Sequence, residues 1–107
     1  MHDAIKKAQI EAQIVEALRT VHDPEIPVNV YDLGLIYEIN QSDGGQVHIV
    51  MTLTNPNCPV ADTMPLEVKN AVKNVDGVSE VTIDMVFEPE WTKDMMSEAA
   101  MLELGLL

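Results

Sequence analysis

The sequence predicts a small α/β (α+β) domain of two layers, in which a three-stranded sheet carries helices on one face. The main observation is the spacing of the apolar residues, which recur as in a helix or alternate as in a strand. Along the chain this spacing predicts a helix, two strands, a helix, a strand and a final helix. The second is the length of 107 residues. That length allows one hydrophobic core and is too short for two, so residues 1–107 are expected to form a single domain.

The first helix is expected between residues 4 and 21. Its apolar residues recur at helical spacing and share one face: Ile10, Ile14, Leu18 and Val21. The helix should end before Pro24, because the residue that precedes a proline is pushed out of the α region.

Residues 22–34 are predicted to form a structured loop, because Pro24 and Pro27 exclude a helix interior or a central strand. Asp23 before a proline favours a turn, and Gly34 indicates a positive φ or the close approach of another segment. The loop is rich in oxygen ligands, namely Asp23, Glu25, Asn29 and Asp32. Clustered polar groups in a loop are typical of a site, although a surface turn accounts for each acid equally well.

A hairpin is predicted next, from strands at 35–40 and 46–54 around a turn with two adjacent glycines. The second strand alternates most clearly, with Val47, Ile49, Met51 and Leu53 on its apolar side. His48 falls on the other side, which predicts an exposed strand histidine and not a metal ligand.

The segment 52–60 contains the only cysteine of the chain, Cys58. The residues around it favour turns or stiffen the backbone: Thr54, Asn55, Pro56, Asn57 and Pro59. Such a loop would fix the direction of the sulfur, and a following helix N-terminus would favour the thiolate, which binds metals. A lone cysteine is more often a small buried hydrophobe. The position of Cys58 between two regular elements favours the functional interpretation.

The second helix is expected to end at residues 76–77, and two starts remain open. A start at Pro59 places Cys58 at the cap, but Pro65 then lies in a helix interior. Asp62 as the N-cap instead places Pro65 in the first turn, where proline is tolerated. The earlier, proline-bent start is preferred.

The last third of the chain predicts a strand at 78–87 and a final helix. The strand has one apolar face, formed by Val81, Ile83, Met85 and Phe87. The final helix is capped by Thr92 or Ser97, closed by Gly105, and carries Met95, Met96, Met101, Leu102 and Leu104. A three-stranded sheet leaves two edges and one face open, so a homodimer is expected.

The composition narrows the classes of partner. Eighteen acidic residues stand against six Lys and Arg, for a formal charge of −12. This balance argues against nucleic acid and fits solubility, a cation-tolerant surface or a basic protein partner, and an ordinary acidic cytosolic protein accounts for it as well. No apolar run reaches membrane-spanning length, Lys6 and Lys7 interrupt any signal peptide, and one cysteine allows no disulfide framework, so a cytoplasmic protein is expected.

Three motifs carry a resemblance to a known family: Asp23-Pro-Glu-Ile-Pro27 with Asp32-Leu-Gly-Leu-Ile36, Thr54-Asn-Pro-Asn-Cys-Pro59, and Glu90-Trp-Thr92 with Met96-Ser-Glu98. From about residue 10 to 105 the chain resembles the metal–sulfur (iron–sulfur) cluster assembly family, which includes SufT-like and PaaD-like proteins and cytosolic iron–sulfur targeting adaptors. The resemblance implies an iron–sulfur cluster assembly domain fold and a role in maturing iron–sulfur proteins. It also implies that Cys58 is the functional thiol, with Asp23 and Glu25 beside it.

Two differences between this sequence and other members of the family narrow the resemblance to the SufT type. No cysteine follows Cys58, whereas PaaD-like proteins carry further cysteines that suit a zinc site, so a phenylacetate-oxygenase role is not expected. No G-x-x-x-x-G-K-S/T motif occurs, so nucleotide chemistry would belong to a partner.

A cluster normally takes four thiolates, and one chain offers one. The favoured hypothesis is therefore a non-enzymatic adaptor or transfer factor that makes transient contact with iron or a cluster between a carrier or scaffold and an apo client. A metal-free adaptor is the alternative. A thiol enzyme with His48 as base and Asp23 orienting it is a weaker one. RNA binding of the KH type is disfavoured because no G-x-x-G loop occurs.

Overall fold

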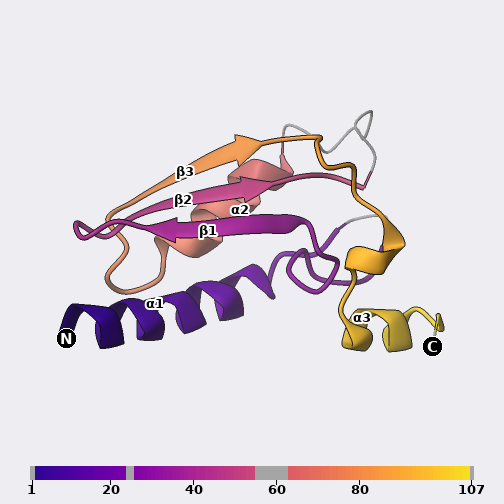
Figure 1. The fold of residues 1–107 in the computed structure, drawn as a ribbon, viewed down its shortest axis with the longest axis horizontal. Coiled ribbons are helices and arrows are strands. Elements are labelled where there is room, and N and C mark those ends of the chain that lie inside the picture. The colour runs from indigo at the N-terminus through magenta and orange to yellow at the C-terminus, as the bar shows by residue number, and fades with distance from the viewer. Residues whose placement is uncertain (1, 24–25, 55–62, 107) are drawn as a thin grey trace.

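The structure is a computed structural model, and it describes residues 2–23, 26–54 and 63–106 (Figure 1). The elements along the chain are α1 (His2–Leu18), β1 (Ile36–Gln41), β2 (Gln46–Met51), α2 (Met64–Lys73), β3 (Glu80–Met85), the 3-10 helix η1 (Lys93–Met95) and α3 (Glu98–Glu103). The predicted order of helices and strands is therefore confirmed.

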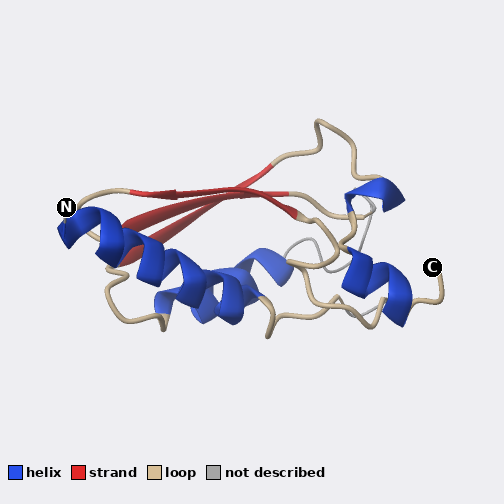
Figure 2. Cartoon of the chain, turned by 60° about the horizontal axis from the view of Figure 1, so that its bottom comes forward, coloured by secondary structure: helices blue, strands red, loops and turns tan. Residues whose placement is uncertain are grey.

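The three strands form one sheet in the order β1-β2-β3. β1 and β2 pair antiparallel as the predicted hairpin, whereas β2 and β3 pair in parallel through the α2 crossover. Figure 2 shows α1 and α2 together on one face of the sheet. This arrangement confirms the two-layer class.

The core lies between the sheet and these two helices. Val47, Ile49, Met51 and Leu53 are all at most 3% exposed, so the predicted apolar face of β2 is confirmed. The helices contribute the side chains that cover this face: Ile14, Leu18, Met64, Val68 and Val72. His48 is exposed as predicted, with Nδ1 2.8 Å from Oγ1 of Thr82 on β3.

The first helix ends at Leu18, three residues earlier than predicted. Thr20 tightens the last turn, because its N–H and Oγ1 both donate to the Ala17 carbonyl. Val21 is still buried, but its carbonyl accepts from the Val30 N–H, 2.8 Å away. Val21 therefore lies beyond the helix and pairs with the following loop.

The second helix begins at Met64 with Thr63 as its N-cap, so both predicted starts, at Pro59 and after Asp62, were too early. This start places Pro65 in the first turn, where its missing N–H removes no helical hydrogen bond.

The predicted final helix is two short helices separated by an extended residue pair. Met96 (ψ 148°) and Ser97 (ψ 162°) interrupt the helical backbone, so η1 ends at Met95 and α3 starts after Ser97. The Ser97 N–H donates to the Asp32 carbonyl and Ser97 Oγ accepts from the Ala100 N–H. Ser97 is thus the N-cap of α3, which confirms one of the two predicted caps, Thr92 or Ser97.

The third strand also ends earlier than predicted, at Met85. Phe87 was expected on the core face but is 43% exposed, because the strand alternation no longer applies beyond Met85. Among the helices that the structure describes, none is long and apolar enough to span a lipid bilayer.

Candidate functional site

The segments that carry the predicted site converge at one end of the sheet. β2 and β3 are parallel, so their carboxyl ends meet at the same edge. Figure 1 shows that the loop after α1, the amino end of α2 and the segment 86–97 lie at this end too. Four predicted site residues are described there: Asp23, Asp32, Gly34 and Thr54. The others lie outside the described residues: Glu25, Asn55, Pro56, Asn57, Cys58 and Pro59.

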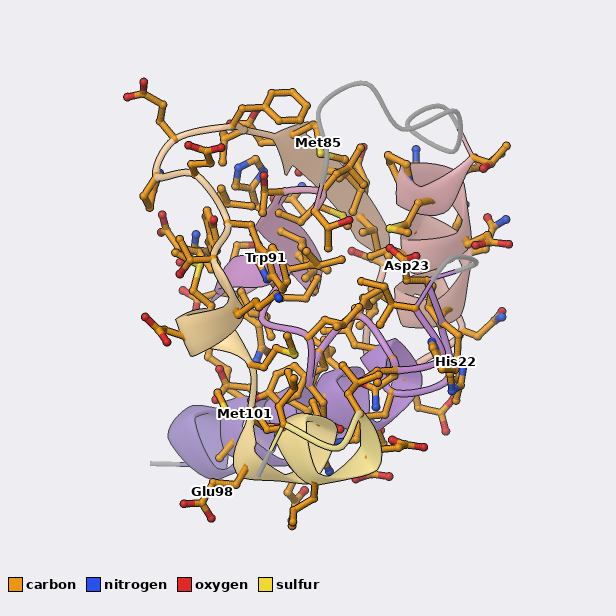
Figure 3. The ribbon with its side chains drawn as sticks, turned by 90° about the vertical axis from the view of Figure 1, so that its right-hand side faces the viewer. His22, Asp23, Met85, Trp91, Glu98 and Met101 are labelled. Carbon is orange, nitrogen blue, oxygen red and sulfur yellow. The ribbon has the colours of Figure 1, made fainter. Side chains whose placement is uncertain are left out.

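Asp23 is buried, with 4% of its surface exposed. Its Oδ1 accepts from the Ile26 N–H at 3.1 Å, and its own N–H donates to the Val28 carbonyl at 3.2 Å. These bonds hold Asp23 within the loop, and residues 24 and 25 of the predicted turn lie outside the described residues. Figure 3 shows Asp23 on the α2 side of this end, with His22 at the outer edge. Its role as an iron or cluster ligand stays a prediction.

Asp32 is part of a local network that holds the loop in shape. Its Oδ2 accepts from Asn29 Nδ2 at 2.8 Å and lies 3.8 Å from Arg19 Nε, while its N–H donates to Asn29 Oδ1. The Arg19 guanidinium also lies over the Tyr31 ring, 5.3 Å from the centroid. These contacts favour a structural role for Asp32.

Gly34 meets both conditions that the sequence predicted. Its φ is +84°, and a Cβ at this position would collide with the backbone carbonyl of Met95. A glycine is needed because the segment before α3 passes directly over the loop.

Two aromatic residues hold the segment 86–95 against β1 and the loop before it, and neither of them was predicted to have this role. The Trp91 indole N–H donates to the Leu33 carbonyl at 2.7 Å. The Tyr37 hydroxyl donates to the Pro89 carbonyl at 2.7 Å and lies 3.6 Å from the Met95 sulfur. Trp91 stands in the motif Glu90-Trp-Thr92, which was a signal for its position but not for its partner.

A cavity of about 380 Å³ opens at this end, between the end of β2 and the segment 87–91. Its lining residues are Thr52, Leu53, Thr54, Phe87, Glu88, Pro89, Glu90 and Trp91. Thr54 lies on the cavity wall four positions before Cys58 in the chain. Within residues 2–23, 26–54 and 63–106, no group of three or more His, Cys, Asp or Glu side chains could hold a metal ion.

The Tyr37 phenol provides a pH test of this packing. Burial raises the pKa of Tyr37 above its ordinary value of 10.0, while a hydrogen bond with Thr52 opposes the shift. The folded protein therefore keeps a proton that the unfolded chain releases, and the free energy of unfolding should fall as pH rises above about 10. Urea titrations of wild type and Tyr37→Phe across this range measure the slope, which should be smaller in the variant. Equal slopes would contradict the burial of the phenol.

Comparison with known proteins decides the family. The family model described as iron–sulfur cluster assembly protein matches residues 11–84. The chain belongs to this family. A relative named Fe-S protein maturation auxiliary factor, from Porphyromonas gingivalis, is 62% identical over 92% of this chain and 94% of its own length. The Fe-S protein maturation auxiliary factor SufT of Staphylococcus aureus is 36% identical over 80% of this chain and 98% of its own length.

The fold of the family is shared as well. A crystal structure of a domain of unknown function (DUF59) from Bacillus anthracis superposes with a TM-score of 0.88 at 32% identity. The match covers 97% of this chain and 99% of that one. The family and fold that the three motifs implied are confirmed.

Proposed function

We propose that this protein is a non-enzymatic auxiliary factor in the maturation of iron–sulfur proteins, and that Cys58 makes transient thiolate contact with iron or a cluster as cargo. The observation that carries the proposal is membership of the iron–sulfur cluster assembly family by a chain with a single cysteine. This chain matches the relatives named as maturation auxiliary factors over nearly their whole length, which supports the same role here.

The ligand count limits what one chain can do with a cluster. Four thiolates normally hold a [2Fe–2S] or [4Fe–4S] cluster, and this chain supplies one. A complete shell therefore needs ligands from a second copy, a partner protein or small thiols. Labile sharing of a cluster between proteins fits one ligand per chain better than stable ownership does.

The described part of the site supports the proposal that the segment containing Cys58 presents its thiol to partner proteins. The residues before this segment, Thr52, Leu53 and Thr54, line a cavity together with Trp91, whose position is held by its hydrogen bond to Leu33. The acidic loop after α1 reaches the same end of the molecule. We expect carriers or scaffolds and apo clients as partners, a homodimer when a cluster is bridged, and a cytoplasmic location.

Anaerobic reconstitution with iron and sulfide tests the proposal. Wild type should take up less than one iron or cluster equivalent per chain and lose it on gel filtration, whereas Cys58→Ser should take up at least about tenfold less, because the only thiolate is gone. Absorption spectra, native mass and iron content measure the uptake. Asn70→Ser, which changes an exposed side chain of α2 outside the predicted site, is the control and should load like wild type.

Two outcomes would contradict the proposal. Equal iron uptake by Cys58→Ser would remove the thiol from the mechanism and favour the metal-free adaptor. A cluster that survives gel filtration on a monomer would show that the chain supplies more ligands than its one cysteine.

A further inference from the structure

A groove that the proposed site does not use runs along the sheet face opposite α1 and α2. Its volume is about 700 Å³, and it lies between the strands and the segment 86–95. Apolar side chains line it: Ile36, Val50, Val86 and Met95. Three exposed carboxylates stand along it, at Glu38, Asp84 and Glu88. The groove is therefore apolar inside and acidic at its rim.

The cations of the chain lie outside the sheet. The strands β1, β2 and β3 contain no Lys or Arg, and neither do the residues that line the groove. The segment 86–95 carries one cation, Lys93, which is exposed in η1 and does not line the groove. The six cations lie in or directly after α1, in α2 and in η1: Lys6, Lys7, Arg19, Lys69, Lys73 and Lys93. The charged residues that line the groove are thus all acidic, which attracts cationic partners and repels acidic ones.

The groove is formed before any partner arrives. The segment 86–95 is tied to β1 by the Tyr37–Pro89 hydrogen bond and to the loop before β1 by the Trp91–Leu33 hydrogen bond, both 2.7 Å long. The close passage of Met95 over Gly34 holds its far end. A wall held at three points needs no ordering on binding, which lowers the entropic cost of association.

The groove also adjoins the candidate site. Glu88 and Pro89 line both the groove and the cavity that contains Thr54. A chain that occupies the groove would therefore lie next to the start of the segment that contains Cys58.

We infer that this groove docks a segment of a partner protein that carries Lys or Arg beside apolar side chains. The apolar side chains enter the groove, and the cations pair with Glu38, Asp84 and Glu88. This inference rests on the proposed function, because it names the kind of partner that would be held beside the site. It predicts binding that weakens as salt rises, since rim charges are exposed and screened.

A labelled peptide tests the inference directly. The probe is fluorescein-Gly-Lys-Val-Lys-Val-Lys-Gly, and its counterpart has Glu in place of Lys; fluorescence anisotropy gives Kd at low and high ionic strength. Wild type should bind the lysine peptide and not the glutamate peptide. Glu38→Lys/Asp84→Lys should weaken binding by at least about tenfold, because two attractions become repulsions.

A control variant with the same change of net charge separates the effect of charges at the groove on peptide binding from the effect of the protein's net charge. Glu11→Lys/Glu103→Lys places the new cations on α1 and α3, and its Kd should stay within about threefold of wild type. If the reversed pair fails to fold, Glu38→Gln/Asp84→Asn removes the charges without adding any and should still weaken binding by about threefold.

Several results would overturn the inference. Equal weakening by the control variant would show that only net charge matters, and equal binding of the glutamate peptide would exclude charge recognition. A dimer that dissociates in Glu38→Lys/Asp84→Lys, seen by sedimentation, would make a second copy the occupant. Cys58→Ser should bind the peptide like wild type, and the groove variant should load iron like wild type, so this inference and the proposed function can fail separately.

Discussion

Gly34→Ala should lower the free energy of unfolding by about 2–5 kcal/mol. A left-handed backbone costs an alanine about 1–2 kcal/mol, and forcing a methyl group into a packed contact costs about 1–3 kcal/mol more. At Gly34 both costs arise, because φ is +84° and the added Cβ meets the rigid carbonyl of Met95. Urea denaturation followed by far-UV circular dichroism measures the change.

Two other glycines separate the causes of this effect. Gly105 has φ +74° with open space around its Cβ position, so Gly105→Ala should show only the backbone cost of about 1–2 kcal/mol. Gly44 has neither a positive φ nor a neighbour within 4 Å, so Gly44→Ala should be nearly neutral. If Gly34→Ala were no worse than Gly105→Ala, the segment at Met95 would be free to move away.

Ile49→Ala should also cost about 2–5 kcal/mol, because it opens a cavity where the core is closed on all sides. Ile49 is fully buried at the centre of β2, and in register it lies between Ile39 of β1 and Ile83 of β3. A domain of this size is stabilised by only about 5–15 kcal/mol in total. The fluorescence of Trp91, the single tryptophan, reports the urea transition.

Val50→Ala is the matched control for Ile49→Ala. Val50 is the next residue of the same strand but faces the groove, where it is only partly buried. Its truncation should cost less than about 1 kcal/mol. A loss as large as that of Ile49→Ala would mean that the groove face is covered, by a second copy or another chain, under the conditions of the measurement.

Sequence periodicity was sufficient for the elements with strong alternation or a long apolar stripe. The face of β2 that carries Ile49, the exposed position of His48 and the hairpin turn were all predicted, because they depend on near neighbours in the chain. Element ends were less well predicted. Phe87 was assigned to the core face because the alternation of β3 continues in sequence after its hydrogen bonding has stopped.

The candidate site shows the same division. Gly34 could be predicted, because a single glycine in a polar loop usually marks a positive φ or a close backbone approach. The predicted final helix breaks at Met96 and Ser97 because the Ser97 N–H donates to Asp32, 65 positions earlier. The partners of Trp91 and Tyr37 are 58 and 52 positions away, and no local pattern encodes such pairs.

The sequence by itself determined the two-layer class, the apolar faces, the single cysteine and the motifs of the iron–sulfur cluster assembly family. These features follow from residue identity and from spacings of a few positions, which set local backbone preference and side-chain direction. Only the tertiary structure decided the strand order, the parallel pairing of β2 with β3 and the acidic groove. These features depend on contacts between segments that are far apart in the sequence. Such contacts form and stabilise the fold only when the whole core packs.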